Sequence, residues 1–256
     1  MAAAERFVDT LRTDTSYRAD AALSYDAFMP PGTVFADDAV HLGVIRRAGG
    51  VALELATGNG RFLIPALEAG LAVEGIDNSA DMIAVCRGHA ERRGLTAVLH
   101  VGDMAPLALA RTYEAIVCPA SSFSLITDVE VAHAALRSYR EHLAPGGQLA
   151  ITLFTADPAQ VGSFAWRLRR TGTDPDTGVT YVVHESVGPD TAPQTILTYN
   201  RLETYDARGR QVGAAEIRKL RTRWWQRDEF TEALTAAGFE KVTILGDEDG
   251  WVALAR

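Results

Sequence analysis

The strongest indication of the fold is the stretch Val51–Gly60, which reads VALELATGNG. Its first half is short and mostly apolar, and it predicts a buried strand. Its second half is a glycine-containing turn that predicts entry into a helix over residues 61–69. Glycine permits positive φ and close approach of a ligand to the backbone, and a helix N-terminus behind the turn favours a negative group. The sequence therefore has a candidate ligand site at residues 54–60.

The alternation of strand and helix continues after this turn. Further strands are predicted at 71–77, 97–101, 113–118 and 148–154, and helices at 80–93 and 129–143. Short apolar strands that alternate with helices predict βαβ units, and therefore a Rossmann-like, doubly wound, mostly parallel α/β sheet. In such a sheet the ligand lies beyond the carboxyl ends of the strands, which is where the turn at 54–60 falls.

The rest of the chain completes a single domain, 1–256, in four parts. These parts are a helical cap at 1–49, a ligand-binding core at 50–155, an inserted β lid at 156–225, and a final helix with two strands at 226–256. Helices are expected at 1–24, 36–48 and 226–237, lid strands at 180–186, 195–205 and 216–225, and a hairpin at 241–245 and 251–255. The lid strands are predicted to be antiparallel and to cross the mouth of the site, and the hairpin completes a seven-stranded sheet.

Composition narrows the classes of partner. The 256 residues carry a formal net charge of −8, without the basic footprint typical of proteins that bind nucleic acid. Two cysteines, Cys86 and Cys118, form neither a zinc motif nor a disulfide framework, so no metal is expected. Nothing in the sequence has the pattern of a signal peptide or a membrane span. We expect a cytoplasmic protein, monomeric or homodimeric, that acts on a small molecule without nucleic acid or membrane.

The spacing of the turn separates the cofactors that such a site can hold. A dinucleotide fingerprint, G-x-G-x-x-G, starting at Gly58 and Gly60 requires a third glycine where this chain has the bulky Leu63. Glu54 lies before the turn, where a pyrophosphate has no use for a carboxylate. S-adenosylmethionine (SAM) carries an ammonium group instead of a phosphate, and Glu54 and carbonyls of the turn can receive it. The pattern favours SAM over NAD.

Two more acidic residues follow strand ends. Asp77 ends the second strand, where a carboxylate can accept both hydroxyls of a ribose, and Asn78 follows it. An N-cap role for Asp77 is the structural alternative, although Asn78 or Ser79 can cap that helix instead. After the third strand, Gly102-Asp103-Met104 offers a carboxylate for an adenine amine and a thioether for its ring.

Together these motifs resemble the cofactor motifs of the class I SAM-dependent methyltransferases, over about residues 50–155. Ala56 stands where that family usually has its first glycine. Two further segments, Tyr25-Asp26 and Ile116–Phe123, resemble those of small-molecule N-methyltransferases such as glycine N-methyltransferase and the amino-sugar N-methyltransferases. The resemblance implies that Tyr25, Glu54, Ala56, Gly58, Gly60, Asp77, Asn78, Gly102, Asp103, Met104 and Pro119 contact SAM. It further implies that Ser121 faces the substrate.

The expected reaction is methyl transfer from SAM to nitrogen or oxygen of a small molecule in specialised metabolism. His184 and Tyr17 are the candidates for a base or for orienting the acceptor, and Arg201 and Trp224 are candidate substrate contacts. An exposed strand histidine and a core tryptophan remain the alternatives for His184 and Trp224. Leu125 stands where the resembled enzymes carry a histidine. NAD-dependent oxidoreduction and a non-catalytic SAM-binding module remain as other functions.

Overall fold

The computed structural model describes residues 17, 20–157, 161–162, 164–247 and 250–256. The expected helix at 1–24 falls mostly outside these residues; its residues 20–24 belong to α2 (Asp20–Phe28), which ends just before Met29-Pro30. The other helices are α3 (Asp38–Ala48), α4 (Leu63–Glu68), α5 (Ala80–Arg92), the short 3₁₀ helix η1 (Ser122–Leu125), α6 (Val129–His142) and α7 (Arg227–Ala236).

The predicted mostly parallel sheet is confirmed. Its strands are β1 (Ala52–Leu55), β2 (Val73–Asp77), β3 (Val98–Val101), β4 (Tyr113–Cys118), β5 (Leu143–Leu153), β10 (Val242–Gly246) and β11 (Trp251–Ala255). The order is β10-β11-β5-β4-β1-β2-β3, with β1 to β5 parallel and the hairpin β10–β11 antiparallel beside β5. Strand β5 begins at Leu143, earlier than the expected 148, because Leu143 already pairs with Tyr113 of β4. The register then shifts before Gln148 pairs with Ala115.

Helices cover both faces of this sheet and create two cores. On one face, α6 and α7 pack against large strand residues such as Leu53, Ile116 and Leu149. On the other face, α3, α4 and α5 pack against smaller ones such as Ala52 and Ala115. Burial of alternate side chains on opposite faces fixes the strand register, because a slip of one residue would exchange the two sets. The carboxyl ends of β1 to β5 therefore meet at one edge, where the site lies.

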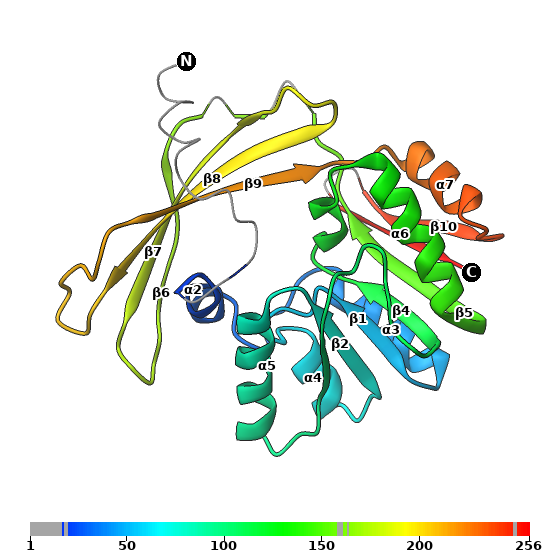
Figure 1. Cartoon of the computed structure of the whole chain (residues 1–256), viewed down its shortest axis with the longest axis horizontal. Coiled ribbons are helices and arrows are strands. Elements are labelled where there is room, and N and C mark those ends of the chain that lie inside the picture. Colours follow the sequence, from blue (N-terminus) through cyan, green and yellow to red (C-terminus); the bar gives the residue numbers. More distant parts are fainter. Residues whose placement is uncertain (1–16, 18–19, 158–160, 163, 248–249) are drawn as a thin grey trace.

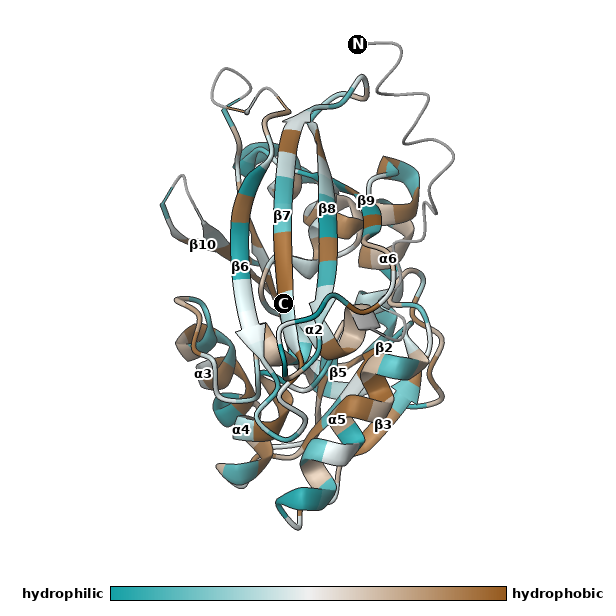
Figure 2. Cartoon of the chain, turned by 90° about the vertical axis from the view of Figure 1, so that its left-hand side faces the viewer, coloured by the Kyte–Doolittle hydropathy of each residue, from teal (hydrophilic) through white to brown (hydrophobic). Residues whose placement is uncertain are grey.

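The lid is a separate four-stranded antiparallel sheet in the order β6-β7-β8-β9. Its strands are β6 (Arg167–Thr173), β7 (Thr180–Pro189), β8 (Thr195–Tyr205) and β9 (Glu216–Arg223). Figure 1 shows this sheet as a layer of its own, with β9 running toward α6 and α7. Figure 2 shows the strands side by side, with hydrophobic and hydrophilic bands along β7 and β8.

Strand β6 was not expected from the sequence. Its residues, RLRRTGT, carry little apolar signal and are largely exposed, because β6 is an edge strand that is held mainly by backbone pairing with β7. Helix α2 packs on it at Gly172, where a Cβ atom would come within 2.7 Å of the Phe28 ring. Helix α2 also contacts α5, so it joins the lid to the core. No helix in the described ranges has the length and apolar character needed to cross a bilayer.

Candidate functional site

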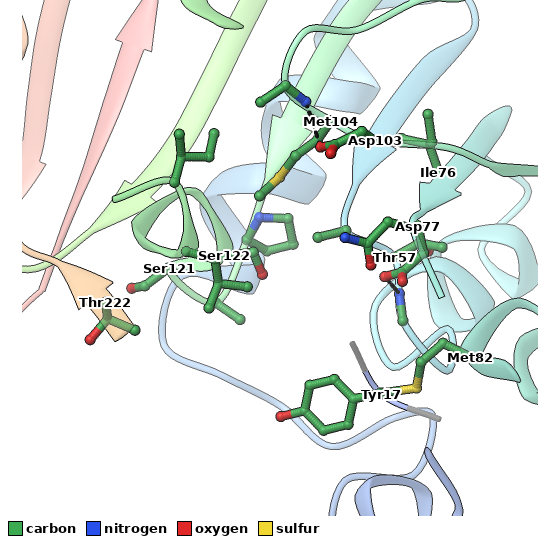
Figure 3. Close-up of a pocket in the computed structure, with 18 of the residues that line it drawn as sticks. Tyr17, Thr57, Ile76, Asp77, Met82, Asp103, Met104, Ser121, Ser122 and Thr222 are labelled. Atoms are coloured by element: carbon green, nitrogen blue, oxygen red, sulfur yellow. Dashed lines mark hydrogen bonds between the residues drawn. The ribbon is translucent and has the colours of Figure 1, made fainter. Parts of the chain in front are cut away.

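A pocket of about 590 Å³ lies at the carboxyl ends of the parallel strands. Its walls come from the segments that follow β1 to β5, from Tyr17 and Tyr25 near α2, and from the end of β9. Figure 3 shows two sides: Asp77, Asp103 and Thr57 lie on one, and Ser121, Ser122 and Thr222 lie across from them. The remaining lining residues are Glu54, Ala56, Gly58, Asn59, Arg61, Ile76, Asn78, Met82, Gly102, Met104, Ala105, Pro119, Ala120, Leu125, Ile126, Thr127, Asp128, Val131, Phe154, Leu220 and Arg221.

The turn after β1 has left-handed backbone at three positions. Ala56 has φ 52°, Gly58 has φ 57° and Gly60 has φ 84°. A non-glycine residue in this region costs about 1–2 kcal/mol, so Ala56 is strained where a glycine would not be. Gly60 does not line the pocket; a Cβ atom there would lie 2.6 Å from Cys86 Sγ, so Gly60 allows the turn to pack against α5.

Glu54 is a buried carboxyl at the end of β1. Its side chain is 2% exposed, and it accepts a 2.6 Å hydrogen bond from the Thr57 hydroxyl. Burial raises the pKa of Glu54 to about 8, although the Thr57 bond and the nearby Arg61 charge act in the opposite direction. A cation that enters the pocket would stabilise the charged form of this buried carboxyl, so Glu54 is suited to bind a cationic group.

Asp77 ends β2 and is fixed by two backbone amides. Gly58 N donates to Oδ2 and Ser79 N donates to Oδ1, each at 2.9 Å. Burial raises the pKa of Asp77, and the two amide bonds oppose that shift. The cap of α5 is the Ser79 hydroxyl, which accepts from Met82 N, so Asp77 is not the helix cap. Because a carboxylate has about four acceptor positions, Asp77 keeps capacity for two further donors in the pocket.

The third acidic residue lies after β3. Asp103 Oδ1 accepts from Ala105 N at 2.9 Å, and the side chain reaches the pocket beside Met104. Met104, Ile76 and Met82 give this side of the pocket apolar surface suited to a flat ring. The three predicted carboxylates are therefore brought together from three separate strand ends.

The N-terminal segment is tied to the glycine turn by a polar chain. Asn59 Nδ2 donates to Asp26 Oδ1 at 2.7 Å and to Met29 O at 2.8 Å, and His89 Nε2 lies 2.7 Å from the same Asp26 oxygen. Asp26 thus links α2 to the turn and to α5. The adjacent Tyr25 lines the pocket, and burial, with a smaller contribution from Tyr17, raises its pKa to about 12.

Tyr17 also lines the pocket. Its ring lies edge-on to Tyr25 with centroids 5.3 Å apart, and the Arg218 guanidinium lies 4.1 Å from its ring centroid. The Tyr17 carbonyl accepts from the Ser79 hydroxyl. Because Arg218 belongs to β9, these contacts join the lid, the N-terminal segment and the start of α5 on one side of the pocket.

The loop after β4 is strained. Ala120 and Ser121 are consecutive non-glycine residues with φ 57° and 58°, and both line the pocket. Two such residues in sequence cost on the order of 1–3 kcal/mol each and are held only where neighbouring contacts compensate. One contact is a 3.0 Å hydrogen bond from Ala120 N to Asp37 Oδ2. Sequence reasoning missed Asp37 because an aspartate just before a helix has the pattern of an ordinary N-cap.

Besides Gly60, three predicted residues lie outside the pocket. His184 and Arg201 are cross-strand partners in the lid, and both are near Glu203: Arg201 Nη2 is 2.5 Å from Oε1, and His184 Nδ1 is 3.8 Å from Oε2. Trp224 is 8% exposed and is absent from the pocket wall. Glu203 is buried and lies beside both side chains, and the sequence has no signal for that arrangement.

Comparison with known proteins identifies the core. Residues 52–147 match the family model described as a methyltransferase domain. This segment is a methyltransferase domain. The match spans the turn at 54–60, Asp77, Asp103 and Pro119, so the predicted resemblance is confirmed for the core.

Two curated relatives from Streptomyces match parts of this chain. A dTDP-3-amino-3,6-dideoxy-alpha-D-glucopyranose N,N-dimethyltransferase of Streptomyces fradiae is 35% identical over 99 residues, which is 39% of this chain and 37% of the relative. A dTDP-3-amino-3,4,6-trideoxy-alpha-D-glucopyranose N,N-dimethyltransferase of Streptomyces venezuelae is 31% identical over 140 residues, 53% of this chain and 57% of the relative. The matched segments thus span less than two thirds of either relative.

The whole fold is found in solved structures. The X-ray structure of the sugar N-methyltransferase KedS8 from a Streptoalloteichus species aligns with a TM-score of 0.71 and 22% identity, over 96% of each chain. At this level of identity the likeness shows that the lid and the core share the arrangement of a known fold.

The strain at Ala56 predicts that Ala56→Gly stabilises the protein by up to about 1 kcal/mol. Glycine removes the steric cost of positive φ, but it loses more backbone entropy on folding, and this loss offsets part of the gain. Gly58→Ala is the matched control: its Cβ atom would meet nothing within 4 Å, so only the φ penalty remains and about 1 kcal/mol should be lost. Urea unfolding measures both. An Ala56→Gly protein less stable than the wild type contradicts the interpretation.

The raised pKa of Glu54 predicts a pH-dependent gain in stability for Glu54→Gln. Between the ordinary value of 4.5 and about 8, the folded protein holds this proton more tightly than the unfolded chain, so wild-type stability falls as pH rises through that window. Glutamine lacks this titration and still accepts from Thr57. Denaturant unfolding without ligand should show a larger advantage of the variant at pH 8.5 than at pH 5.5, growing by up to about 1.36 kcal/mol for each pH unit inside the window. An equal difference at both pH values contradicts it.

Proposed function

We propose that this chain transfers a methyl group from SAM to the amine nitrogen of a small, amino-sugar-like acceptor in specialised metabolism. The observation that carries the proposal is the convergence of Glu54, Asp77 and Asp103 on one pocket, in which Asp77 and Asp103 lie across from the hydroxyl groups of Ser121, Ser122 and Thr222. The curated relatives, whose names describe N,N-dimethylation of amino sugars, support nitrogen as the methylated atom.

The donor and acceptor groups of the pocket fit SAM. Asp77 has spare acceptor capacity for a pair of ribose hydroxyls, and Glu54 is a buried carboxyl that gains from a nearby ammonium. Asp103 and the neighbouring Met104 suit an adenine amine and ring. When bound, SAM supplies an activated methyl group on a sulfonium, so the task of the protein is to align the acceptor and exclude water.

The acceptor side favours an amine over an alcohol. Of the six histidines, all of which lie in the described ranges, none lines the pocket. Tyr25 has a pKa raised to about 12, Asp128 caps α6 by accepting from Glu130 N and Val131 N, and Arg221 pairs with Asp190 at 2.7 Å. An alcohol needs a base to become a good nucleophile, whereas an amine can lose its proton to solvent before it binds. Within this proposal Tyr17 and Ser121 orient the acceptor.

The setting proposed for the enzyme is the reducing cytoplasm, since Cys86 and Cys118 are both free and buried. The net charge of −8 argues against nucleic acid as the acceptor. Monomer and homodimer both remain compatible with the proposal.

The decisive experiment measures formation of S-adenosylhomocysteine with matched acceptors. We expect turnover with an amino sugar and little with the same sugar bearing a hydroxyl in place of the amine, with a product one methyl group heavier. The rate should rise with pH as the free-base amine becomes abundant. Turnover with the hydroxyl sugar alone would assign oxygen as the methylated atom and would refute the N-methyl proposal. Binding of NADH without affinity for SAM would support the oxidoreductase alternative instead.

Asp77→Ala should weaken SAM binding at least about tenfold, which corresponds to about 1.4 kcal/mol, because the ribose loses its acceptor. Asp81→Ala is the matched control, since Asp81 is an exposed aspartate in the first turn of α5 that does not line the pocket. Calorimetry with both folded variants measures the difference. Equal affinity of the two variants would overturn the ribose assignment.

A further inference from the structure

We propose that Asp37 is a positioning residue, whose carboxylate holds the loop Pro119–Ser122 in the conformation that forms the acceptor side of the pocket. The inference rests on the proposed function for the role of that side, but the contact itself is independent of it. Asp37 lies immediately before α3, far from the loop in sequence, and Ala120 N donates to its Oδ2 atom at 3.0 Å.

The carboxylate of Asp37 is the end of a short relay. Thr152 of β5 lies 2.5 Å from the same Oδ2 atom, and His41 Nε2 lies 2.7 Å from the Thr152 hydroxyl oxygen. An ionised carboxylate only accepts hydrogen bonds, so the Thr152 hydroxyl donates to Asp37 and accepts from His41 Nε2–H. Two elements that pack against each other, α3 and β5, thus fix the orientation of the carboxylate.

The ionised state of Asp37 is maintained by its donors. Burial by itself raises the pKa of this carboxyl, but hydrogen bonds from His41, Thr152 and Ala120 N outweigh burial and hold the pKa well below its usual range. The Ala120 amide therefore faces a full negative charge at every pH at which the enzyme would work. A charge-assisted hydrogen bond of this kind is stronger than one to a neutral group.

The side chain of Asp37 does not cap the helix that it precedes. An aspartate at a helix N-cap ordinarily accepts from the first amides of its own helix, yet Asp37 makes no such bond to α3. Its neighbour Asp38 is engaged by Arg61 at 2.7 and 2.9 Å and by Phe35 N at 2.7 Å. Asp37 instead bonds to the one loop of the described pocket wall with two consecutive non-glycine residues at positive φ.

A role limited to anchoring α3 does not account for this arrangement. Thr152 and His41 already join the sheet to the helix, so an anchor needs no contact with Ala120. The loop, by contrast, needs an external partner, because Ala120 and Ser121 have no intrinsic preference for left-handed backbone. The loop bears Ser121 and Ser122, which face Asp77 and Asp103 across the pocket (Figure 3).

The test compares Asp37→Ala with Asp37→Asn in the full-length protein. Alanine removes the acceptor, whereas asparagine keeps one oxygen for Ala120 N and loses only the charge. For Asp37→Ala we expect amide hydrogen exchange at residues 120–122 to accelerate at least about tenfold. We expect kcat to fall at least about tenfold and the affinity for S-adenosylhomocysteine to fall much less, because Glu54, Asp77 and Asp103 are untouched and only the contact expected from Pro119 is disturbed. Asp37→Asn should retain most of both properties.

Glycine rescue separates positioning from general stability. Adding Ala120→Gly to Asp37→Ala should restore part of kcat, because glycine adopts positive φ without the steric cost and the Ser121 side chain is kept. If Asp37 only anchored α3, substitutions in the loop after β4 would restore nothing. Should Asp37→Ala fail to fold, Thr152→Val gives the milder test, since it removes one donor to the carboxylate and should produce a smaller acceleration of exchange at 120–122.

Unchanged exchange at residues 120–122 in folded Asp37→Ala overturns the proposal, as does a loss of kcat that Ala120→Gly does not reverse. A wild-type protein that methylates no amine would refute the proposed function alone, because the exchange measurement needs neither acceptor nor turnover.

Discussion

The hydrogen bond from Gly58 N to the Asp77 carboxylate is the contact on which the pocket depends. It joins the turn after β1 to the end of β2, two strands that pair in parallel from Ala52–Val73 to Leu55–Ile76. Parallel pairing requires both carboxyl ends to lie at the same edge, and the bond then fixes the turn against its neighbour before any ligand arrives. Asp77 is consequently held in place by the backbone, and its remaining acceptor capacity faces the pocket.

Elements distant in sequence close this edge by polar contacts. Asn59 of the turn bonds Asp26 of α2, and Asp26 in turn meets His89 of α5. From the lid, Arg218 of β9 stacks on Tyr17, which lies beside Tyr25. The core thereby supplies the carboxylates, while the N-terminal segment and the end of β9 complete the wall of the pocket.

In the described part of the chain, three of the five non-glycine residues with positive φ line the pocket. Ala56, Ala120 and Ser121 have positive φ, and all three line the pocket wall. Each is compensated by neighbouring structure: Thr57 N bonds Ile76 O beside Ala56, and the Asp37 carboxylate holds Ala120 N. A strained loop held by a partly buried charge gives the pocket a fixed shape, which the proposed alignment of a methyl acceptor requires. The two large cores on either side of the sheet provide the stability that such strain consumes.

The parallel core could be predicted from the amino-acid sequence. Strand and helix periodicities and glycine turns are local features of the chain, and they can be recognised without knowledge of the tertiary contacts. The sequence also determined where Glu54, Asp77 and Asp103 would meet, since each follows a strand and the carboxyl ends of parallel strands share one edge. The residues that form the proposed acceptor side of the pocket could be identified only from the tertiary structure. Strand β6 carries little apolar signal. His184 and Arg201 lie beside Glu203 and outside the pocket. Asp37 has the sequence position of an ordinary helix cap, although its side chain bonds to Ala120 N. Those outcomes depend on which buried charges and backbone amides lie near one another after folding, and such long-range pairings have no periodicity along the chain from which they can be predicted.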